Sequence, residues 1–294
     1  MRVATSRVLA DDVLELIPAA PDPTGANLVC KPVGKLKESG AIQEVLPLRT
    51  DGDRALADLG GLATGTWALR WEGPDGTQRP ILTTDPCYDA AEAEDYASRA
   101  RSRAFSAVRT STGRLRVKVR SVRPHAEVRR VRSLGERITV AGFLAYAPEP
   151  SADASEDATP HLVIRGRHRE GEERIFPAEL TGRSFAGRIP LRPLAEAHDD
   201  ARDHNEWDLW LRVPGLDTDL RLGSHVDDIV GKKGRVSFRE TRIAAGAATI
   251  GLRPYYTVKD GLSLLGVAVT GEGAGASEDA DDADDADGAL CEAA

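Results

Sequence analysis

The residues best suited to chemistry in this 294-residue chain form a basic segment near its middle. Between Arg99 and Arg137 there are thirteen arginines and lysines but only two acids, Glu127 and Glu136. Such an excess of positive charge is typical of sites for polyanions, either nucleic acid or a phosphate-bearing polymer. Within the segment four cations alternate with Leu, Val and Val, which predicts the charged face of one strand: Arg114, Arg116, Lys118 and Arg120.

Two interpretations of this segment stay open. It either binds an anionic partner or forms the solvated face of a strand followed by a linker. Proteins that bind single-stranded nucleic acid interleave their cations with aromatic residues, and this segment contains only Phe105. No helix-turn-helix, RRM or zinc-finger pattern is present, so nucleic acid is not expected as the partner.

A second candidate site surrounds a tryptophan. Apolar and polar residues alternate after Trp207, and a similar run surrounds Trp67. The alternation places each tryptophan on the apolar face of its strand and predicts a core position for both. Trp210 falls on the opposite face, between Asp208 and Arg212. An outward tryptophan is either a contact for a ligand or partner or is covered by a loop, and the sequence leaves both open.

The remaining residues form no catalytic motif and no metal site. His198 and His204 are six residues apart, a spacing that fits neither a helical nor a strand pair of metal ligands. No serine stands in a Gly-x-Ser-x-Gly elbow, no glycine-rich phosphate loop follows a strand, and the Asp-rich run 279–287 has no fold around it. We therefore predict no catalytic residue, no metal and no cofactor. The cysteines are too widely spaced for a disulfide framework or a zinc site: Cys30, Cys87 and Cys291.

An internal repeat indicates how the candidate residues are positioned. Trp67-Ala-Leu69 lines up with Trp207-Asp-Leu209, and residues 110–117 line up without a gap with residues 257–264. An earlier pair of segments, 42–48 and 185–191, keeps the same order. Because the copies are about 140 to 150 residues apart, each is a domain and not a short solenoid unit.

Hydrophobic periodicity predicts an all-β protein. Many short period-two runs separated by turn signals are typical of antiparallel sandwiches. We therefore predict two tandem Ig-like β-sandwiches related by the repeat, residues 1–122 and 126–270. Further expected strands are 162–167, 235–239 and 262–269. Short helices are expected at 53–59, 89–103 and 194–202.

Two segments have the composition of disordered chain. Residues 148–160, rich in Pro, Ala, Ser and acids, are predicted to be a disordered loop, and residues 271–294 a disordered acidic tail. Nine acids and no Lys or Arg follow Thr270, so residues 1–270 carry a net charge of +1 although the whole chain carries −8. The acidity is therefore confined to the terminus.

No targeting signal is recognisable in the sequence. No apolar run is long enough to span a bilayer. Asp11, Asp12 and Glu15 interrupt the N-terminal stretch where a signal peptide would need apolar residues. We expect a cytoplasmic protein without a membrane span.

One stretch resembles a known family. The phrase from Arg253 to Leu264, with Ile189-Pro-Leu191 and Trp207-Asp-Leu-Trp-Leu211 before it, resembles the C-terminal β-sandwich modules of actinobacterial family-2 and teichoic-acid glycosyltransferases. The resemblance covers about residues 136–265. It implies paired Ig-like modules associated with oligomerisation and polymer contact. The catalytic nucleotide-sugar domain of that family has no counterpart here, so transferase activity does not carry over.

These observations predict a non-catalytic accessory or assembly module for cell-surface polysaccharide or teichoic-acid-type glycosyl transfer. Its expected partners are a glycosyltransferase, further copies of this chain, or an anionic glycopolymer contacted by the basic strand. Two alternatives stay open. One is a transferase that acts with a partner subunit at a site near Asp208, Trp210 and Arg212. The other is a regulatory polyanion binder that its own acidic tail inhibits.

Overall fold

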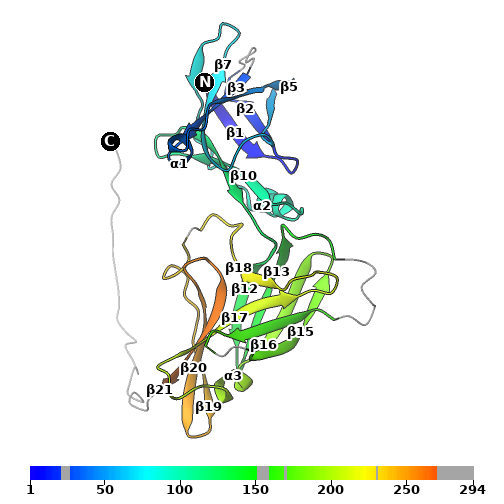
Figure 1. The fold of residues 1–294 in the computed structure, drawn as a ribbon, viewed down its shortest axis with the longest axis vertical. Coiled ribbons are helices and arrows are strands. Elements are labelled where there is room, and N and C mark those ends of the chain that lie inside the picture. Colours follow the sequence, from blue (N-terminus) through cyan, green and yellow to red (C-terminus); the bar gives the residue numbers. More distant parts are fainter. Residues whose placement is uncertain (21–26, 151–158, 169–170, 230, 270–294) are drawn as a thin grey trace, which may run out of the picture.

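The structure, a computed structural model, describes residues 1–20, 27–150, 159–168, 171–229 and 231–269. These residues form mostly strands with three short helices, which confirms the all-β prediction (Figure 1). The predicted loop at 148–160 lies largely, and the predicted tail at 271–294 wholly, outside the described residues. The strands group into an N-terminal part, up to residue 121, and a C-terminal part that begins at residue 125.

The N-terminal part contains eleven of the described strands and two of the described helices. The strands are β1 (Arg2–Val8), β2 (Val13–Pro18), β3 (Asn27–Val33), β4 (Glu44–Pro47), β5 (Arg49–Asp51), β6 (Arg54–Asp58), β7 (Gly65–Glu72), β8 (Gln78–Pro80), β9 (Leu82–Thr83), β10 (Arg103–Arg109) and β11 (Leu115–Ser121). The helices are α1 (Lys35–Glu38) and α2 (Ala90–Ala97).

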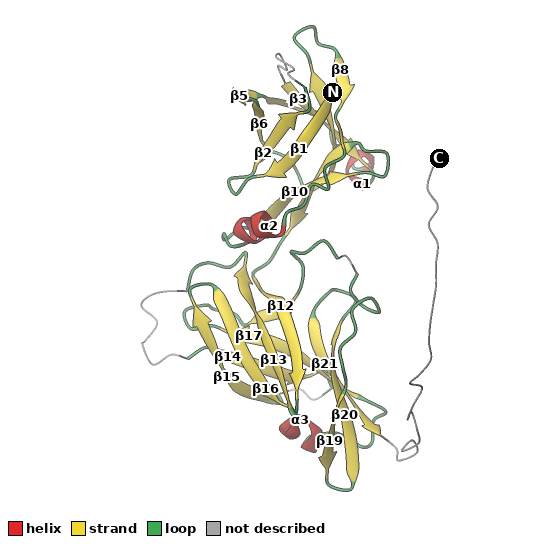
Figure 2. Cartoon of the chain, turned by 180° about the vertical axis from the view of Figure 1, so that it is seen from behind, coloured by secondary structure: helices red, strands yellow, loops and turns green. Residues whose placement is uncertain are grey.

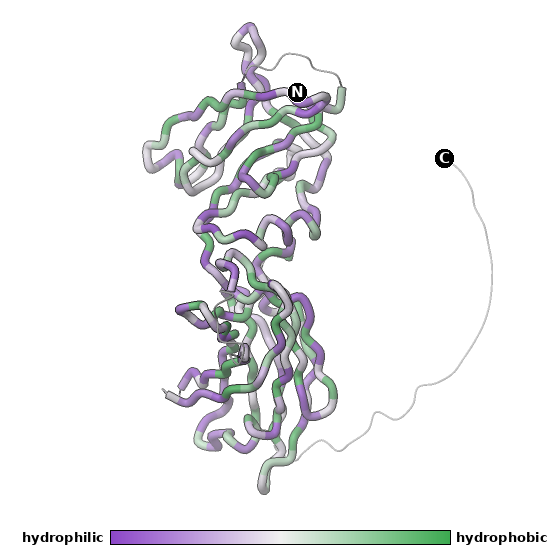
Figure 3. Tube along the Cα trace, turned by 90° about the vertical axis from the view of Figure 1, so that its right-hand side faces the viewer, coloured by the Kyte–Doolittle hydropathy of each residue, from purple (hydrophilic) through white to green (hydrophobic). Residues whose placement is uncertain are grey.

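Two sheets of the N-terminal part share one core. Their strand orders are β5-β6-β2-β1-β9 and β10-β11-β7-β3-β4, with β8 paired to β7. Trp67 and Leu69 of one sheet and Leu14 and Leu16 of the other all lie in the same buried cluster. Period-two sequences put every second side chain into this core, which is why hydrophilic and hydrophobic residues are mixed along the chain trace (Figure 3).

The C-terminal part contains the other described elements. They are β12 (His125–Leu134), β13 (Arg137–Ala145), β14 (His161–Gly166), β15 (Glu173–Thr181), β16 (Ser184–Pro190), α3 (Arg192–Glu196), β17 (Asn205–Arg212), β18 (Leu220–Gly223), β19 (Thr241–Ala245), β20 (Ala248–Tyr256) and β21 (Leu262–Val269). Figure 2 shows these strands as one curved sheet, with α3 at its end.

This part differs from the predicted two-sheet sandwich. Its strands form one sheet in the order β14-β15-β16-β13-β12-β18-β17-β21-β20-β19, and β14 also pairs with β17. Seven strands therefore close into a ring around the largest buried cluster, and β21, β20 and β19 extend from it. A bulge between Val128 and Arg130 bends β12, which lets one continuous sheet curve where a two-sheet sandwich was predicted.

The repeat found in the sequence has a counterpart in the strand pairing. Trp67 of β7 lies opposite Val117 of β11, and Trp207 of β17 lies opposite Leu264 of β21, so the aligned residues pair in the same register. In the N-terminal part β1 pairs β2 and β9, and in the C-terminal part β12 pairs β13 and β18 in the same two orientations. Positions around these paired strands can therefore be compared between the two parts. The aligned segments 42–48 and 185–191 do not correspond, because β4 pairs with β3 whereas β16 pairs with β13 and β15.

Some of the expected secondary structure was wrong. Residues 54–58 form strand β6 and not a helix, because Ala55 and Ala57 alternate into the core between exposed Arg54 and Asp58. Alanine favours helices by itself, and here tertiary packing overrides that preference. Residues 235–239 do not form a strand. Helix α2 begins within the predicted range, where the Asp89 side chain accepts hydrogen bonds from the backbone N–H groups of Ala91 and Glu92.

Helix α2 lies where the two parts meet (Figure 1). A small buried cluster there contains Tyr96, Ala97 and Ala104 from the N-terminal part and Phe143, Ala145 and Tyr146 from the C-terminal part. The N–H of Tyr146 donates to the carbonyl of Ala97 over 2.6 Å, and Arg129 forms an ion pair with Glu94. The junction is thus a packed contact in addition to the chain connection.

Candidate functional site

The four predicted cations form a row on the outer face of the N-terminal sheet. We define the basic row as Arg114, Arg116, Lys118 and Arg120. The residues that alternate with them, Leu115, Val117 and Val119, are buried in the core, so the basic side chains point away from it. Arg114 and Lys118 are exposed, and Arg116 and Arg120 are half-buried. Two residues of a strand span about 6.8 Å, so the row places positive charges at a regular spacing.

The residues directly across from the middle of the basic row carry no opposite charge. The cross-strand neighbours of Arg116 and Lys118 are short and uncharged: Val108, Ser106, Ala68 and Thr66. Within the described ranges Arg114, Arg116 and Lys118 form no ion pair, and Arg120 donates to the carbonyl of His225 over 3.3 Å. No described carboxylate forms an ion pair with the row, although Asp89, Glu92, Asp227 and Asp228 line the groove beside Lys118 and Arg120.

A small pocket lies at the β10–β11 turn, and none of the four cations of the basic row lines it. It has a volume of about 310 Å³ and is lined by Arg2 and Arg109 together with the hydroxyl-bearing residues Thr83, Thr84, Thr110, Ser111 and Thr112. Arg109 donates to the carbonyl of Thr84 over 2.7 Å. Cations and hydroxyl groups are the side chains that bind phosphate oxygens, so this pocket suits a phosphate group by itself.

The second predicted site occupies the equivalent face of the C-terminal part. The alignment of Trp67 with Trp207 makes Asp208 equivalent to Ala68, and the paired residue Ser263 equivalent to Arg116. The Asp208 carboxylate accepts from Arg167 and Arg221 at 2.8 Å each and from the Ser263 hydroxyl at 2.7 Å. The face that is bare and basic in one copy is thus neutralised by ion pairs in the other.

Arg212 takes part in a neighbouring set of ion pairs. Its guanidinium donates to Asp219 at 2.9 Å and to Glu173 at 3.2 Å, and Arg165 contacts the same two carboxylates. The hydrogen bond from Arg212 is the main reason that the pKa of Asp219 lies below its usual value. Each of these groups is already paired, which is typical of a structural network.

Asp208 is held ionised by its neighbours. Burial alone would raise the pKa of Asp208, but the hydrogen bond from Arg167 and the charge of Arg221 outweigh it and lower that pKa. Burial in turn lowers the pKa of Arg221. A carboxylate fixed in its charged form by two guanidinium groups is poorly suited to general acid–base work.

Trp210 lies beside these arginines. The guanidinium carbons of Arg165 and Arg221 are 5.1 and 5.5 Å from the centre of its ring, at cation–π distance. Trp210 is half-buried, and its Nε1 is buried without a hydrogen-bond partner among the described residues. The outward position predicted from the period of the strand is correct, and the ring is covered by arginines of the same sheet.

The basic row runs into a groove at the junction of the two parts. This groove has a volume of about 390 Å³, and Lys118 and Arg120 line it together with Tyr88 of the N-terminal part and His225 and Asp227 of the C-terminal part. The loop that carries His225 and Asp227 therefore forms one wall of the groove.

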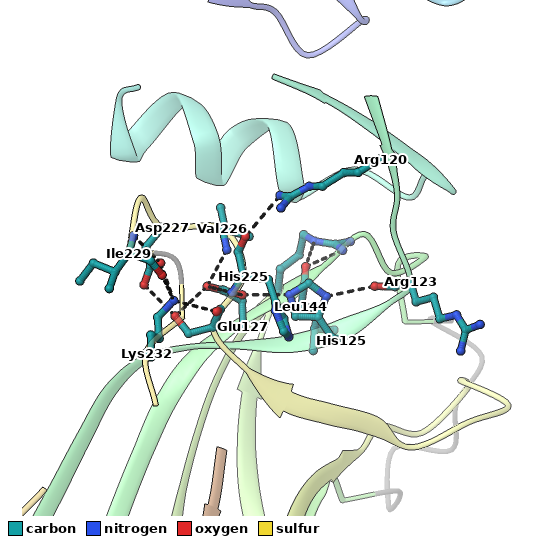
Figure 4. Close-up of polar contacts among 12 residues, drawn as sticks. Arg120, Arg123, His125, Glu127, Leu144, His225, Val226, Asp227, Ile229 and Lys232 are labelled. Carbon is teal, nitrogen blue, oxygen red and sulfur yellow. Dashed lines mark hydrogen bonds and ion pairs between the residues drawn. The ribbon is translucent and has the colours of Figure 1, made fainter. Parts of the chain in front are cut away.

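A buried polar network fixes this loop (Figure 4). Glu127 is 3% exposed, and its carboxylate accepts from the backbone N–H groups of His225, at 2.8 Å, and Val226, at 3.1 Å. It also contacts Nε2 of His125 at 2.9 Å. Lys232, also 3% exposed, donates to Asp227 at 2.6 Å and to the carbonyl of Ile229 at 2.7 Å. Every buried charge has a partner, so the groove wall is held rigidly.

The sequence did not single out this network. Glu127 and Val226 are 99 residues apart, and neither belongs to a recognisable motif. The available signal was that Glu127 is one of only two acids in the basic segment and lies between Ala126 and Val128 near the start of β12. An acid among apolar strand residues needs a buried partner, but its identity depends on the fold.

The network leads to a prediction about pH. Burial and the charge of His125, whose ring is 4.9 Å away, lower the pKa of His225 to about 4, although Glu127 and Asp260 oppose this. In the unfolded chain the value is the ordinary 6.5, so between these values the unfolded state binds more protons. We expect the contribution of His225 to stability to be complete above pH 6.5 and to be lost as the pH falls towards 4.

Urea unfolding at pH 7.5, 6 and 5 measures this effect. His225→Gln should flatten the loss of stability between pH 6.5 and 4, because the group that titrates is absent. The matched control is His204→Gln, which removes an exposed histidine and should keep the wild-type slope. An unchanged slope in His225→Gln would contradict the assignment.

The other candidate ligands do not assemble. Nδ1 of His198 is 2.9 Å from the amide nitrogen of Asn205, and His204 is exposed. Across the described ranges no group of three or more His, Cys, Asp or Glu residues is arranged to hold a metal ion. No described helix is both long and apolar enough to cross a bilayer.

Comparisons with known proteins add a weak structural similarity. No family model matches the sequence, and no curated protein matches it. A crystal structure of S. aureus TarS 217-571 is similar with a TM-score of 0.37 and 12% identity, covering 61% of this chain and 50% of that one. A second structure of S. aureus TarS gives a TM-score of 0.36 with 12% identity, covering 62% of this chain and 33% of that one. The chain thus spans half or less of the structures it resembles.

Proposed function

We propose that the chain is a non-catalytic binding module whose basic row holds an extended anionic polymer with phosphate groups at regular intervals. One observation carries the proposal: the same sheet face is neutralised by ion pairs around Asp208 in the C-terminal copy and is left bare and basic in the N-terminal copy. A face that needed charge only for solubility would not require four cations in line on one strand.

Simple electrostatics favours a polymer over a small ligand. One exposed ion pair contributes only about 0.2–1 kcal/mol, because water and salt screen it. A polymer that meets four cations at once adds these contributions and releases several counterions. At its Arg120 end the row meets the junction groove, where Asp89, Glu92, Asp227 and Asp228 also line the surface and would end the track.

The biological context is a further part of the proposal. The resemblance of residues 136–265 to modules of cell-surface glycosyltransferases supports a role beside the transfer of sugars to a polyol-phosphate or polysaccharide. In that role the chain would hold the glycopolymer for a partner transferase or pair with further copies of itself.

The alternative of a transferase site near Asp208, Trp210 and Arg212 gains no support. Both charged side chains are engaged in ion pairs with neighbouring residues, and the tryptophan ring is covered by arginines. We therefore assign catalysis to none of the three.

Removal of the basic row is expected to weaken polymer binding by about tenfold or more at low salt, because four screened contacts are lost together. The change is Arg114→Ser, Arg116→Ser, Lys118→Ser and Arg120→Ser in the full chain. Affinity for a poly(glycerol phosphate) of defined length should be measured by calorimetry between 50 and 300 mM NaCl. Binding by the wild type should fall with salt, and the dependence should be shallower in the variant.

A matched control removes the same charge elsewhere. In this control variant four exposed cations outside the row are changed to serine: Lys233, Arg239, Arg253 and Lys259. If the control weakens binding as much as the row variant, only net charge matters and the assignment of the row is wrong. If the wild-type chain does not bind the polymer at all, the proposed function is wrong.

A further inference from the structure

A second basic surface lies on the C-terminal part. It is a groove of about 570 Å³ on the outer face of β12, β13, β15 and β16. We define the arginine groove by the three cations along it: Arg130, Arg132 and Arg188. All three are exposed and form no ion pair with any residue in the described ranges. The one acid in its lining is Glu179.

The strand register explains the shape of the groove. Thr139 of β13 pairs with Arg132 on one side and with Arg188 on the other, so one arginine stands on each side of the short Thr139 side chain. One step along the strands, Ala141 pairs with Arg130 and with Ala186. Short residues thus form the floor and the long cations form the rims.

One end of the arginine groove is apolar. Leu134 lines this end and is 55% exposed, and Pro190 lies beside it at the end of β16. An exposed leucine beside three cations suits an acidic segment that also carries an apolar residue. The groove therefore fits a peptide better than it fits a purely anionic polymer.

The chain itself contains a segment with this chemistry. Residues 278–287 include seven acids and no cation, and Leu290 follows them. The last described strand, β21, ends at Val269, which neighbours the β19–β20 turn. Arg192 of α3 contacts the carbonyl of Ala244 in β19 and the carboxylate of Glu136 in the turn that follows Leu134. The chain thus leaves the fold at the same end as the apolar end of the groove.

The connection is long enough. Nine residues, 270–278, span up to about 30 Å when extended. The basic row, in contrast, belongs to the N-terminal part, beyond the junction from this end of the molecule (Figure 1). A tethered segment has a high effective concentration at the nearer surface.

We propose that the C-terminal segment 278–290, with its seven acids and Leu290, binds the arginine groove of its own chain. This inference does not rest on the proposed polymer binding. It assigns an occupant to the second basic surface and leaves the basic row as the accessible site for an external polyanion.

Distances between two spin labels in the full chain test this proposal. One label is placed in the acidic segment with Ala283→Cys and the other beside the groove with Pro177→Cys. The chain also carries Cys87→Ser and Cys291→Ser, and Cys30 is kept because it is fully buried. Double electron–electron resonance between the two labels at low salt should give a narrow distance distribution. The distribution should broaden at about 1 M NaCl, where charges are screened beyond about 3 Å. A second pair, Ala283→Cys with Ser111→Cys, reports on the basic row.

Substitution of the three arginines of the groove tests whether the segment binds there. Arg130→Ser, Arg132→Ser and Arg188→Ser together should lower the ratio of bound to unbound segment about tenfold, since three screened pairs are lost. The matched control, Lys233→Ser with Arg253→Ser and Lys259→Ser, should leave the narrow distribution in place. A broad distribution in the wild type, a narrow one only in the pair at Ser111, or no response to the groove substitutions would each overturn the proposal.

Discussion

Replacing Gly142 with alanine is expected to keep the C-terminal part from folding, or to lower its free energy of unfolding by about 3 kcal/mol or more. A Cβ atom at this position would lie 1.8 Å from the carbonyl oxygen of Glu127 and 2.9 Å from the Phe185 ring. The nearer obstacle is the backbone of β12, so no change of rotamer relieves the clash. Gly142 pairs with Val128 next to the β12 bulge, where the two strands come unusually close.

Urea unfolding of the full chain, with hydrogen exchange to locate the loss in the C-terminal strands, measures this effect. The control is Gly61→Ala, because a Cβ at Gly61 meets no atom within 4 Å and its φ is not in the left-handed region. The control should change stability by less than about 0.5 kcal/mol. If Gly142→Ala unfolds at the same urea concentration as the wild type, the close approach of β12 and β13 is not a feature of the folded protein.

Glu127→Ala is expected to destabilise the C-terminal part by about 3 kcal/mol and to loosen the groove wall. The substitution leaves the backbone N–H groups of His225 and Val226 and the ring of His125 without their buried acceptor. Because His225 and Val226 belong to the loop at the junction, protection from hydrogen exchange should fall first at residues 224–229.

A surface acid provides the comparison. Glu136 is exposed and pairs with Arg192, so Glu136→Ala should cost less than about 1 kcal/mol. Glu127→Gln keeps an acceptor and should lie between the two in stability. Equal unfolding midpoints for Glu127→Ala and Glu136→Ala would show that the buried network does not hold the junction together.

Local patterns predicted single faces well. The alternation around Val117 placed the basic row on the outer face, and the run from Trp207 placed that tryptophan in the core and Trp210 outside it. Side chains of a strand alternate between its two faces, so this result needs no knowledge of the partner strands. The same reasoning failed at residues 54–58, where the alternating alanines carry too little hydrophobic signal to outweigh their helical preference.

The partners of each charge were not predictable in the same way. Asp208 meets Arg167 from 41 residues away, and Glu127 meets Val226 from 99 residues away. Such contacts depend on which strands pair and in what register, and many residues of opposite charge satisfy the same local pattern. The two candidate sites therefore looked alike in the sequence, as charged outer faces, although one is neutralised and the other is bare.

The sequence by itself determined the all-β class, the repeat of the strand pattern, the outer position of the basic row and the core position of Trp67 and Trp207, because these depend on the period of the strand and on the hydrophobic effect. The tertiary structure decided three further matters. It closed seven strands of the C-terminal part into one ring, paired Asp208 with its arginines, and brought Glu127 to the loop at His225. These depend on long-range pairing, which a bulge at Val128 and a glycine at 142 make possible and which no local period encodes.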